Sequence, residues 1–184
     1  MSHEPILDLC LREFRRTKQL ADRAISQLDD EQFFRALAAD GNSVAIVVKH
    51  VAGNARSRWR DFLTSDGEKP DRERDSEFVL DDRDTRADLM RRWEEGWAYL
   101  FGALEPLGEA DLDREVKIRG EALSVLQAIH RQLSHYAYHV GQIVLLARTW
   151  RGDAWRTLSV AKGQSAAFNQ APTSYLADGG KRVG

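Results

Sequence analysis

Apolar residues recur at helical spacing in four long stretches of the chain. In each stretch they fall mostly three or four residues apart, a period that gathers them on one face of a helix. Residue types that cap helix N-termini precede two of the stretches, Ser43 the second and Thr85 or Asp84 the third. The pattern predicts an all-α fold with helices over about 5–28, 44–63, 85–105 and 121–150.

Two polar segments connect the predicted helices. Residues 65–84 are dense in charged and turn-forming residues, and we expect an exposed crossover loop whose charges are solvated. The segment 107–120 contains one short alternation typical of a strand, Glu115–Ile118, which allows at most a small hairpin. Four long helices with one long crossover predict a four-helix bundle over residues 1–150. Residues 151–184 carry several glycines and few apolar anchors, so we expect a tail packed on the bundle or partly disordered.

Composition narrows the class of protein. The 27 basic and 29 acidic residues give a formal net charge of -2, so no global positive field would hold a nucleic acid. Cys10 is the only cysteine, which excludes an intramolecular disulfide and a cysteine-rich metal site and favours a reducing compartment. The first 25 residues lack the apolar segment of a secretory signal, and nothing approaches the roughly 20 apolar residues that span a bilayer. We expect a cytoplasmic protein that contacts neither nucleic acid nor membrane.

The last predicted helix contains the strongest candidate chemistry. Its central part carries no charge except Arg131, so we expect this helix to be mostly buried and its polar groups to need partners. His135 and His139 lie four residues apart on one face, where two imidazoles can share one metal ion. Gln132 and Gln142 fall on the same stripe and are candidates for contacts to these histidines or to a substrate.

A third metal ligand would come from the second predicted helix. His50 is surrounded there by apolar residues, and Asn54 lies one turn further along the same face. Three neutral imidazoles suit Zn²⁺ or Ni²⁺ and leave coordination positions open for water, a thiol or a substrate. An ion held in this way lowers the pKa of bound water or thiol, or polarises a carbonyl as a Lewis acid.

A second interpretation of the same residues stays open. A histidine on an apolar helix face is commonly a core residue paired with a backbone or side-chain group, and the residues alone do not decide between the two. His130 lies off the stripe of His135 and His139 and is expected to pack or to cap. Gly53 and Gly141 interrupt helices near the histidines, where they would leave room for a ligand or, as we favour, allow close helix packing.

Two further groups of side chains have a structural and a functional interpretation. Trp59, Trp93 and Trp97 fall on apolar stripes. This placement favours positions in the core over a cage of aromatic rings around a substrate. A set of arginines could bind an anionic substrate, although such clusters usually form a solvated face. These arginines are Arg56, Arg58, Arg60, Arg91 and Arg92.

Two motifs resemble the DinB-like superfamily of bacterial four-helix-bundle proteins. They are KHVAGN, which contains His50, and HYAYHVGQI, which contains His135 and His139. The resemblance covers residues 5–150, and members bind a divalent metal through a histidine of the second helix and an H-x-x-x-H pair before Gly-Gln. The resemblance therefore implies that His50, His135 and His139 are metal ligands. The stretches GNSVAIVVKHVAGN, DFLTSDGEKP and LSVAKGQSAAFN resemble one bacterial subfamily more than the better-known branches.

The resemblance also implies an activity. Superfamily members include thiol-dependent transferases and isomerases that use bacillithiol, mycothiol or glutathione, with the metal activating the thiol. For this chain that implies a metal-dependent enzyme but not the reaction, because members share the fold and metal site across functions. Our hypothesis is a thiol-dependent S-transferase or a hydrolase that acts on a small molecule, and we expect a homodimer because family members often form one. Many members carry two adjacent histidines before Gly-Gln, whereas this chain has Tyr138-His139-Val140, so we expect its pocket lining to differ.

Other residues near the expected metal have supporting roles in this hypothesis. Asn54 and Gln142 would orient the bound nucleophile, and Tyr136 and Tyr138 are candidate proton donors. No acidic residue has an evident place as general base, because the obvious ones lie in loops. The alternative hypothesis is a non-catalytic bundle that uses a metal or buried histidines for stability, or that serves as an interaction module.

Overall fold

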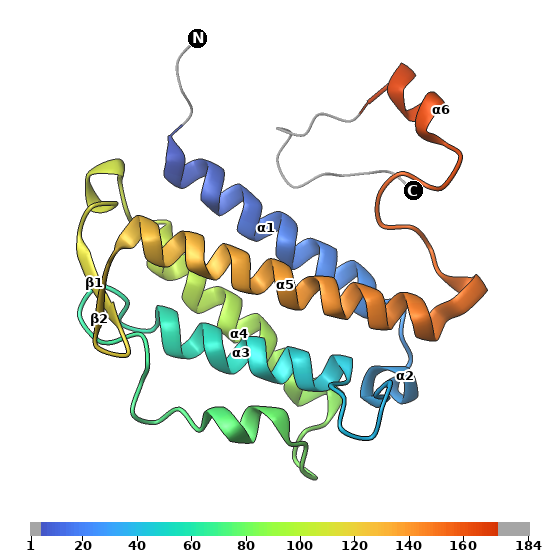
Figure 1. Ribbon diagram of the computed structural model, residues 1–184, viewed down its shortest axis with the longest axis horizontal. Helices are drawn as coiled ribbons and strands as arrows, with labels where there is room; N and C mark the ends of the chain where they lie inside the picture. Colours follow the sequence, from blue (N-terminus) through green and yellow to red (C-terminus); the bar gives the residue numbers. More distant parts are fainter. Residues whose placement is uncertain (1–4, 173–184) are drawn as a thin grey trace.

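The computed structural model describes residues 5–172, and this part of the chain is mostly helical (Figure 1). The α-helices are α1 (Ile6–Ile25), α2 (Asp30–Phe34), α3 (Val44–Trp59), α4 (Arg86–Leu104), α5 (Val125–Arg151) and α6 (Ser165–Gln170). The strands are β1 (Glu115–Ile118) and β2 (Glu121–Ser124), and the short 3-10 helices are η1 (Arg74–Phe78), η2 (Glu109–Asp111) and η3 (Gly152–Ala154). The prediction of a mostly helical chain with at most a small hairpin is confirmed.

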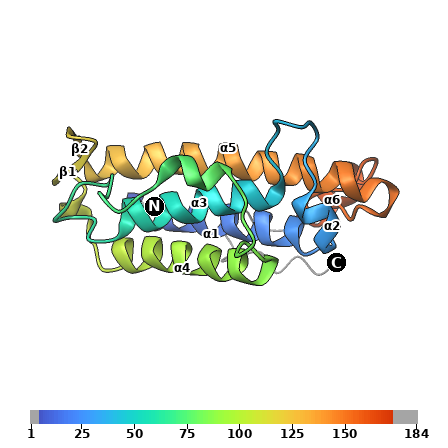
Figure 2. The ribbon, with the colours of Figure 1, turned by 90° about the horizontal axis from the view of Figure 1, so that it is seen from below.

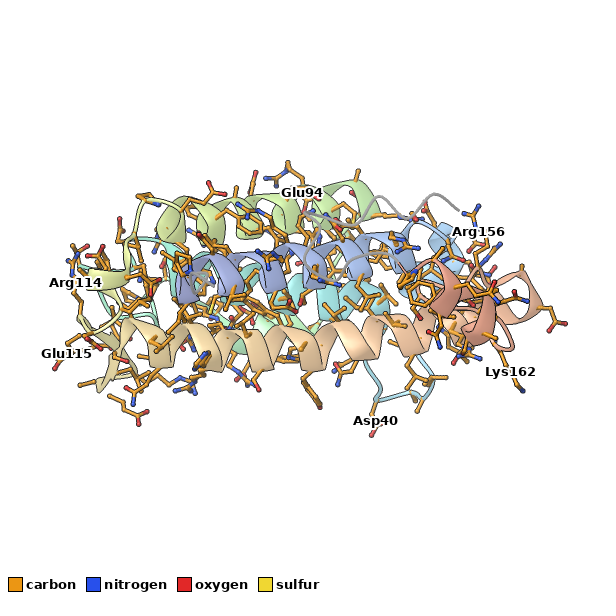
Figure 3. All side chains as sticks on the ribbon, turned by 90° about the horizontal axis from the view of Figure 1, so that it is seen from above. Asp40, Glu94, Arg114, Glu115, Arg156 and Lys162 are labelled. Atoms are coloured by element: carbon orange, nitrogen blue, oxygen red, sulfur yellow. The ribbon has the colours of Figure 1, made fainter. Side chains whose placement is uncertain are left out.

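Four long helices, α1, α3, α4 and α5, lie side by side around one core (Figures 1 and 2). α3 packs on α4 and α1 on α5, and contacts of α3 with α5 and of α1 with α4 close the arrangement. Trp59, Trp93 and Trp97 are buried in this core, as their positions on apolar stripes predict. Charged side chains such as Asp40 and Glu94 project from the periphery instead (Figure 3).

Two helix boundaries differ from the predicted ones by four residues, and the first helix ends three residues early, at Ile25. The helix predicted over 44–63 ends at Trp59, where the chain leaves helical geometry at the next residue. The helix predicted from residue 121 begins at Val125, because the four residues before it form β2, antiparallel to β1. The last residue of that strand, Ser124, caps α5 with its hydroxyl. The hairpin thus fixes where α5 begins.

The expectation that the last long helix is mostly buried is wrong. One side of α5 packs on α1 and α3, while the other side faces solvent and carries large apolar side chains. Tyr138 is 64% exposed and Leu145 is 61% exposed. In a four-helix arrangement, the neighbouring helices cover only one side of each helix. The lack of charge along α5 therefore does not reflect burial.

The chain continues along α1 after α5 ends. Leu158 is buried against the core, and the Arg23 guanidinium donates a hydrogen bond to its carbonyl oxygen at 3.0 Å. Gln27 exchanges hydrogen bonds with the backbone of Arg156. Part of the predicted tail 151–184 therefore packs on the helices, and its residues from 173 onward lie outside the described residues. Within the described chain, no helix has the length and apolar character needed to cross a membrane.

Candidate metal centre

The segment 65–84 covers α3 rather than extending into solvent. Its turn η1 packs directly on α3, as the segment that runs along α3 in Figure 2 shows. Most of the segment is exposed, as expected, but Lys69, Glu77 and Asp84 are buried, so the expectation of solvated charges is wrong for these three residues. Each buried charge in this segment is paired or hydrogen-bonded, which is the condition under which burial of a charge is tolerated.

Three histidines from two helices meet beneath this segment. His50 lies on α3, and His135 and His139 lie one turn apart on α5. Nε2 of His135 is 3.4 Å from Nε2 of His50 and 3.1 Å from Nε2 of His139. One ring nitrogen from each of the three lies within 4.8 Å of the others. The structure therefore brings together the three residues that the sequence selects as candidate ligands.

Hydrogen bonds on the far side of two rings fix which nitrogen carries the proton. Nδ1 of His50 donates to the Glu77 carboxylate at 2.8 Å, and Nδ1 of His139 donates to the Gln142 side-chain oxygen at 3.0 Å. In the neutral form of each ring the single proton is then on Nδ1, and Nε2 bears a lone pair. Both lone pairs therefore point toward Nε2 of His135.

His135 stands between these two lone pairs with a polar atom unsatisfied. Its Nδ1 is buried and has no hydrogen-bond partner in the described part of the chain. Burial, together with the neighbouring His139 and His50, lowers the pKa of His135 to about 3. Burial also lowers the pKa of His139, against an opposing hydrogen bond to Gln142. Both rings are consequently neutral near pH 7, which is the form in which imidazole binds a metal.

Glu77 is the residue of this site that sequence reasoning missed. Its carboxylate accepts two hydrogen bonds from Arg72, each at 2.8 Å, in addition to the one from His50. Burial acts to raise the pKa of Glu77, but the hydrogen bonds from His50 and Arg72 outweigh it and hold the pKa below its ordinary value. The residue is therefore a carboxylate that orients His50 from the side opposite Nε2.

The two glycines near the histidines have different surroundings. A Cβ on Gly53 would lie 2.4 Å from Oε1 of Glu77, so this glycine makes room for the carboxylate. A Cβ on Gly141 would meet no atom within 4 Å, so the expectation of close helix packing is wrong there. At Gly53 the close neighbour is a side chain of η1 rather than a second long helix.

The remaining predicted residues divide between core and rim. The Tyr136 hydroxyl is fully buried, accepts a hydrogen bond from Trp59 and donates one to Asn54 at 3.2 Å. Burial raises the pKa of Tyr136, and its hydroxyl is committed to these two partners. Tyr138 is exposed, with its ring centroid 5.0 Å from that of His139. Only Tyr138 of the two tyrosines lines the cavity beside the histidines.

His130 takes no part in this arrangement. The expectation that it packs or caps is wrong with respect to packing, because its side chain is exposed on α5. The 140° that separates it from His135 around the helix explains why the two histidines point to different environments.

A family model matches residues 2–164 of the chain, and its description is "Protein of unknown function (DUF1572)". The chain belongs to the DUF1572 family. The three histidines and Glu77 all lie within the matched region. No curated protein and no solved structure matches the chain.

In this DUF1572 protein a cavity of about 410 Å³ opens beside the histidines. His50, His135 and His139 line it together with Asn54 and Gln142. Gln132 also lines it, and its side-chain oxygen is buried without a partner among the described residues. A molecule in the cavity would therefore contact the histidines and the amides that sequence analysis places beside them.

Most of the arginines that the sequence singles out lie elsewhere. Arg56 and Arg60 pair with Asp71, and Arg91 and Arg92 pair with Asp88. Arg58 alone of that set lines the cavity. Four arginines that sequence reasoning did not single out as a group complete the lining, namely Arg72, Arg74, Arg119 and Arg131.

Proposed function

We propose that this DUF1572 protein is a divalent-metal-dependent enzyme that acts on a small molecule, built on a DinB-like four-helix bundle. The metal ligands are Nε2 of His50, His135 and His139. The observation that carries the proposal is the convergence of two lone pairs, from His50 and His139, on the third imidazole. Lone pairs placed in this way repel one another unless a proton or a cation lies between them.

The distances between the nitrogens support one shared ion. Nitrogens about 2.0–2.1 Å from one ion are about 2.9 Å apart at right angles and about 3.4 Å apart at tetrahedral angles. The two nitrogen pairs at His135 are 3.1 and 3.4 Å apart. Three neutral nitrogen ligands favour Zn²⁺ or Ni²⁺ over a hard cation such as Mg²⁺. The buried, unpartnered Nδ1 of His135 is a cost that ligation through Nε2 would offset.

When bound, the ion would lower the pKa of a ligated water or low-molecular-weight thiol, or polarise a carbonyl group. The chain's own residues hold the ligands for this task. Glu77 fixes the tautomer and orientation of His50, and Gln142 does the same for His139. Tyr138 is the tyrosine that can hold or release a proton at the cavity, because it is exposed and lines the cavity.

The reaction class rests on the resemblance to the DinB-like superfamily. A thiol-dependent S-transferase and a hydrolase both use a nucleophile held at an open metal position. The cavity beside the histidines supports either, since it leaves space for a nucleophile and a second reactant. The homodimer that the resemblance implies stays a prediction.

Metal analysis by mass spectrometry on untagged protein tests this proposal. We expect near-stoichiometric metal in the wild type and none in His50→Ala or His135→Ala, with circular dichroism showing that both variants remain folded. His130→Ala is the matched control, because His130 lies on α5 with His135 but is exposed and outside the cavity lining. A folded wild type that takes up no metal after reconstitution with Zn²⁺ or Ni²⁺ would refute the ligand assignment.

A structural metal is the second candidate function. The contacts that favour it are those of Glu77, which tie the segment 65–84 to α3 through His50. In that case metal removal would release this segment and lower stability, as it does in structural zinc domains. Thermal unfolding with and without a chelator separates the two functions, since a catalytic ion in a preformed site leaves the metal-free fold intact.

A further inference from the structure

The cavity beside the histidines has an unusual charge distribution for this protein. Among the described residues that line it, every residue with a full charge is an arginine, whereas the whole chain has a formal net charge of -2. The five arginines come from separate segments, Arg58 from α3, Arg131 from α5, Arg119 from the β1–β2 turn, and Arg72 and Arg74 from the segment over α3. The fold thus gathers positive charge at one place from an overall acidic sequence.

Carboxylates pair with the arginines on the inner side of the cavity. Glu68 accepts hydrogen bonds from Arg58, Arg72 and Arg119, at 3.0 to 3.3 Å, and Glu77 binds Arg72. Arg58 also donates to a backbone carbonyl. Asp66 adds a third carboxylate, which accepts hydrogen bonds from the backbone of Arg119 and Gly120 and lies near Arg58. The charges of these three inner guanidinium groups are therefore largely balanced, and the arginines at the rim supply the positive charge that a ligand would meet.

The arginines at the rim have weaker partners. The nearest carboxylates to Arg74 and Arg131, those of Asp75 and Glu121, are each 3.7 Å away, beyond hydrogen-bond distance. Both arginines are about half exposed, and neither donates a hydrogen bond within the described part of the chain. The Arg74 guanidinium instead lies 5.1 Å from the ring centre of Phe78, which in turn packs on His50. Their donors are free to meet a ligand.

We propose that this cavity binds a small organic anion whose carboxylate or phosphate oxygens contact Arg74, Arg119 and Arg131 while its other end lies against the three histidines. The proposal rests on the proposed metal centre, which would hold the reactive end of the ligand. A guanidinium presents a planar fork of donors that matches both oxyanions, and three such groups around one cavity favour an anion over a neutral molecule. The volume of about 410 Å³ accommodates a metabolite-sized ligand rather than a lone inorganic ion.

Calorimetric titration of the Zn²⁺-loaded protein tests this proposal with matched probes. Succinate and phenyl phosphate supply the carboxylate and phosphate arms, and succinamide is a neutral compound of the same length as succinate. We expect at least one anion to bind about tenfold more tightly than succinamide, with affinity that falls as salt is added. Whichever of succinate and phenyl phosphate binds more tightly identifies the preferred oxyanion.

Arginine variants locate the binding. Arg131→Gln is the cleanest, because the one ion pair of Arg131 in the described chain, with Glu121, is 3.7 Å long. Arg119→Gln removes a second half-exposed cation, which also binds Glu68. Each is expected to weaken binding of the preferred anion about tenfold, since a charge-assisted contact is lost. Arg148→Gln is the control, because Arg148 lies on α5 with Arg131 but does not line the cavity, and it should leave the affinity unchanged. Circular dichroism on each variant verifies folding.

The metal content of the same samples separates two kinds of failure. Equal affinity for succinate, phenyl phosphate and succinamide in a protein that holds stoichiometric metal overturns the anion site and leaves the metal centre standing. Equal losses in Arg131→Gln and Arg148→Gln overturn it as well. Arginine-dependent anion binding in a protein that takes up no metal would instead retain the anion site and refute the metal centre.

Discussion

Replacement of Gly53 by alanine should perturb the proposed metal centre without touching a proposed ligand. The Cβ of Gly53→Ala would lie 2.4 Å from Oε1, 2.8 Å from Cδ and 3.2 Å from Cγ of Glu77. Real Cβ atoms essentially never approach below 3.0 Å, so the carboxylate must move by at least about 0.6 Å. Three hydrogen bonds of 2.8 Å hold that carboxylate, one from His50 and two from Arg72, and a displacement of this size cannot preserve all three.

Two measurable effects follow from this displacement. Loss of the carboxylate that orients a ligating histidine typically weakens metal binding 10- to 100-fold, and we expect Gly53→Ala to fall in that range. Weakening of the buried Glu77–Arg72 pair also lowers stability. Full disruption of this pair would cost about 3–5 kcal/mol. The higher helix propensity of alanine than of glycine offsets about 1 kcal/mol of this loss. The metal-free variant should therefore be less stable than the wild type by about 1–3 kcal/mol.

Gly141→Ala provides the matched control. It makes the same substitution inside α5 close to His139, but its Cβ meets no atom within 4 Å. It should gain up to about 1 kcal/mol of stability and keep the wild-type metal affinity. Competition with a chromophoric chelator measures the affinity, and urea unfolding followed by circular dichroism measures the stability. If Gly53→Ala behaves as Gly141→Ala does in both assays, Glu77 does not orient His50.

Three further predictions concern other side chains of the site. Gln142→Ala removes the acceptor for Nδ1 of His139 and should weaken metal binding about tenfold in the chelator competition, and an unchanged affinity would argue against its supporting role. Tyr136→Phe leaves Trp59 and Asn54 without their partner and should lower the free energy of unfolding by about 1–3 kcal/mol while metal content stays unchanged, since the hydroxyl faces the core. The metal-free protein should lose stability as the pH falls from 6.5 toward 3, because His135 in the unfolded chain binds a proton below about 6.5 and in the folded chain only near 3. The unfolded state binds more protons in this window, so urea midpoints that stay constant across it would contradict the burial of a neutral His135.

The sequence predicts the helices and the pair of His135 and His139 because both depend on local spacing. The apolar period assigns the long helices, and the four-residue step between His135 and His139 places them on one face whatever the tertiary structure. His50 is a different case, because its partners lie on another helix. His50 is a candidate because the residues around it in α3 are apolar. The packing of α3 against α5 is what brings His50 to His135 and His139.

Glu77 could not be found by the same reasoning. It lies in a segment where charged residues are frequent, and solvation is the ordinary fate of charges in such a segment. The structure buries it because His50 and Arg72 together supply three hydrogen bonds to its carboxylate. One signal was present in the sequence: Gly53 follows His50 by three residues, on the same face of α3, and a glycine there leaves space for a side chain beside the histidine.

The arginine lining escaped prediction because net charge sums over the whole surface. A formal charge of -2 argues against a global field that would hold a polyanion, but it does not limit the charge at a single cavity. Arg119 and Arg131 are 12 residues apart in the sequence and lie on a strand turn and a helix, so no window or helical face groups them with Arg74. Their association depends on the β1–β2 hairpin and on the segment over α3, which together close the cavity beside α5. Whether a small anionic ligand binds therefore depends on the charges that line the cavity and not on the net charge of the whole chain.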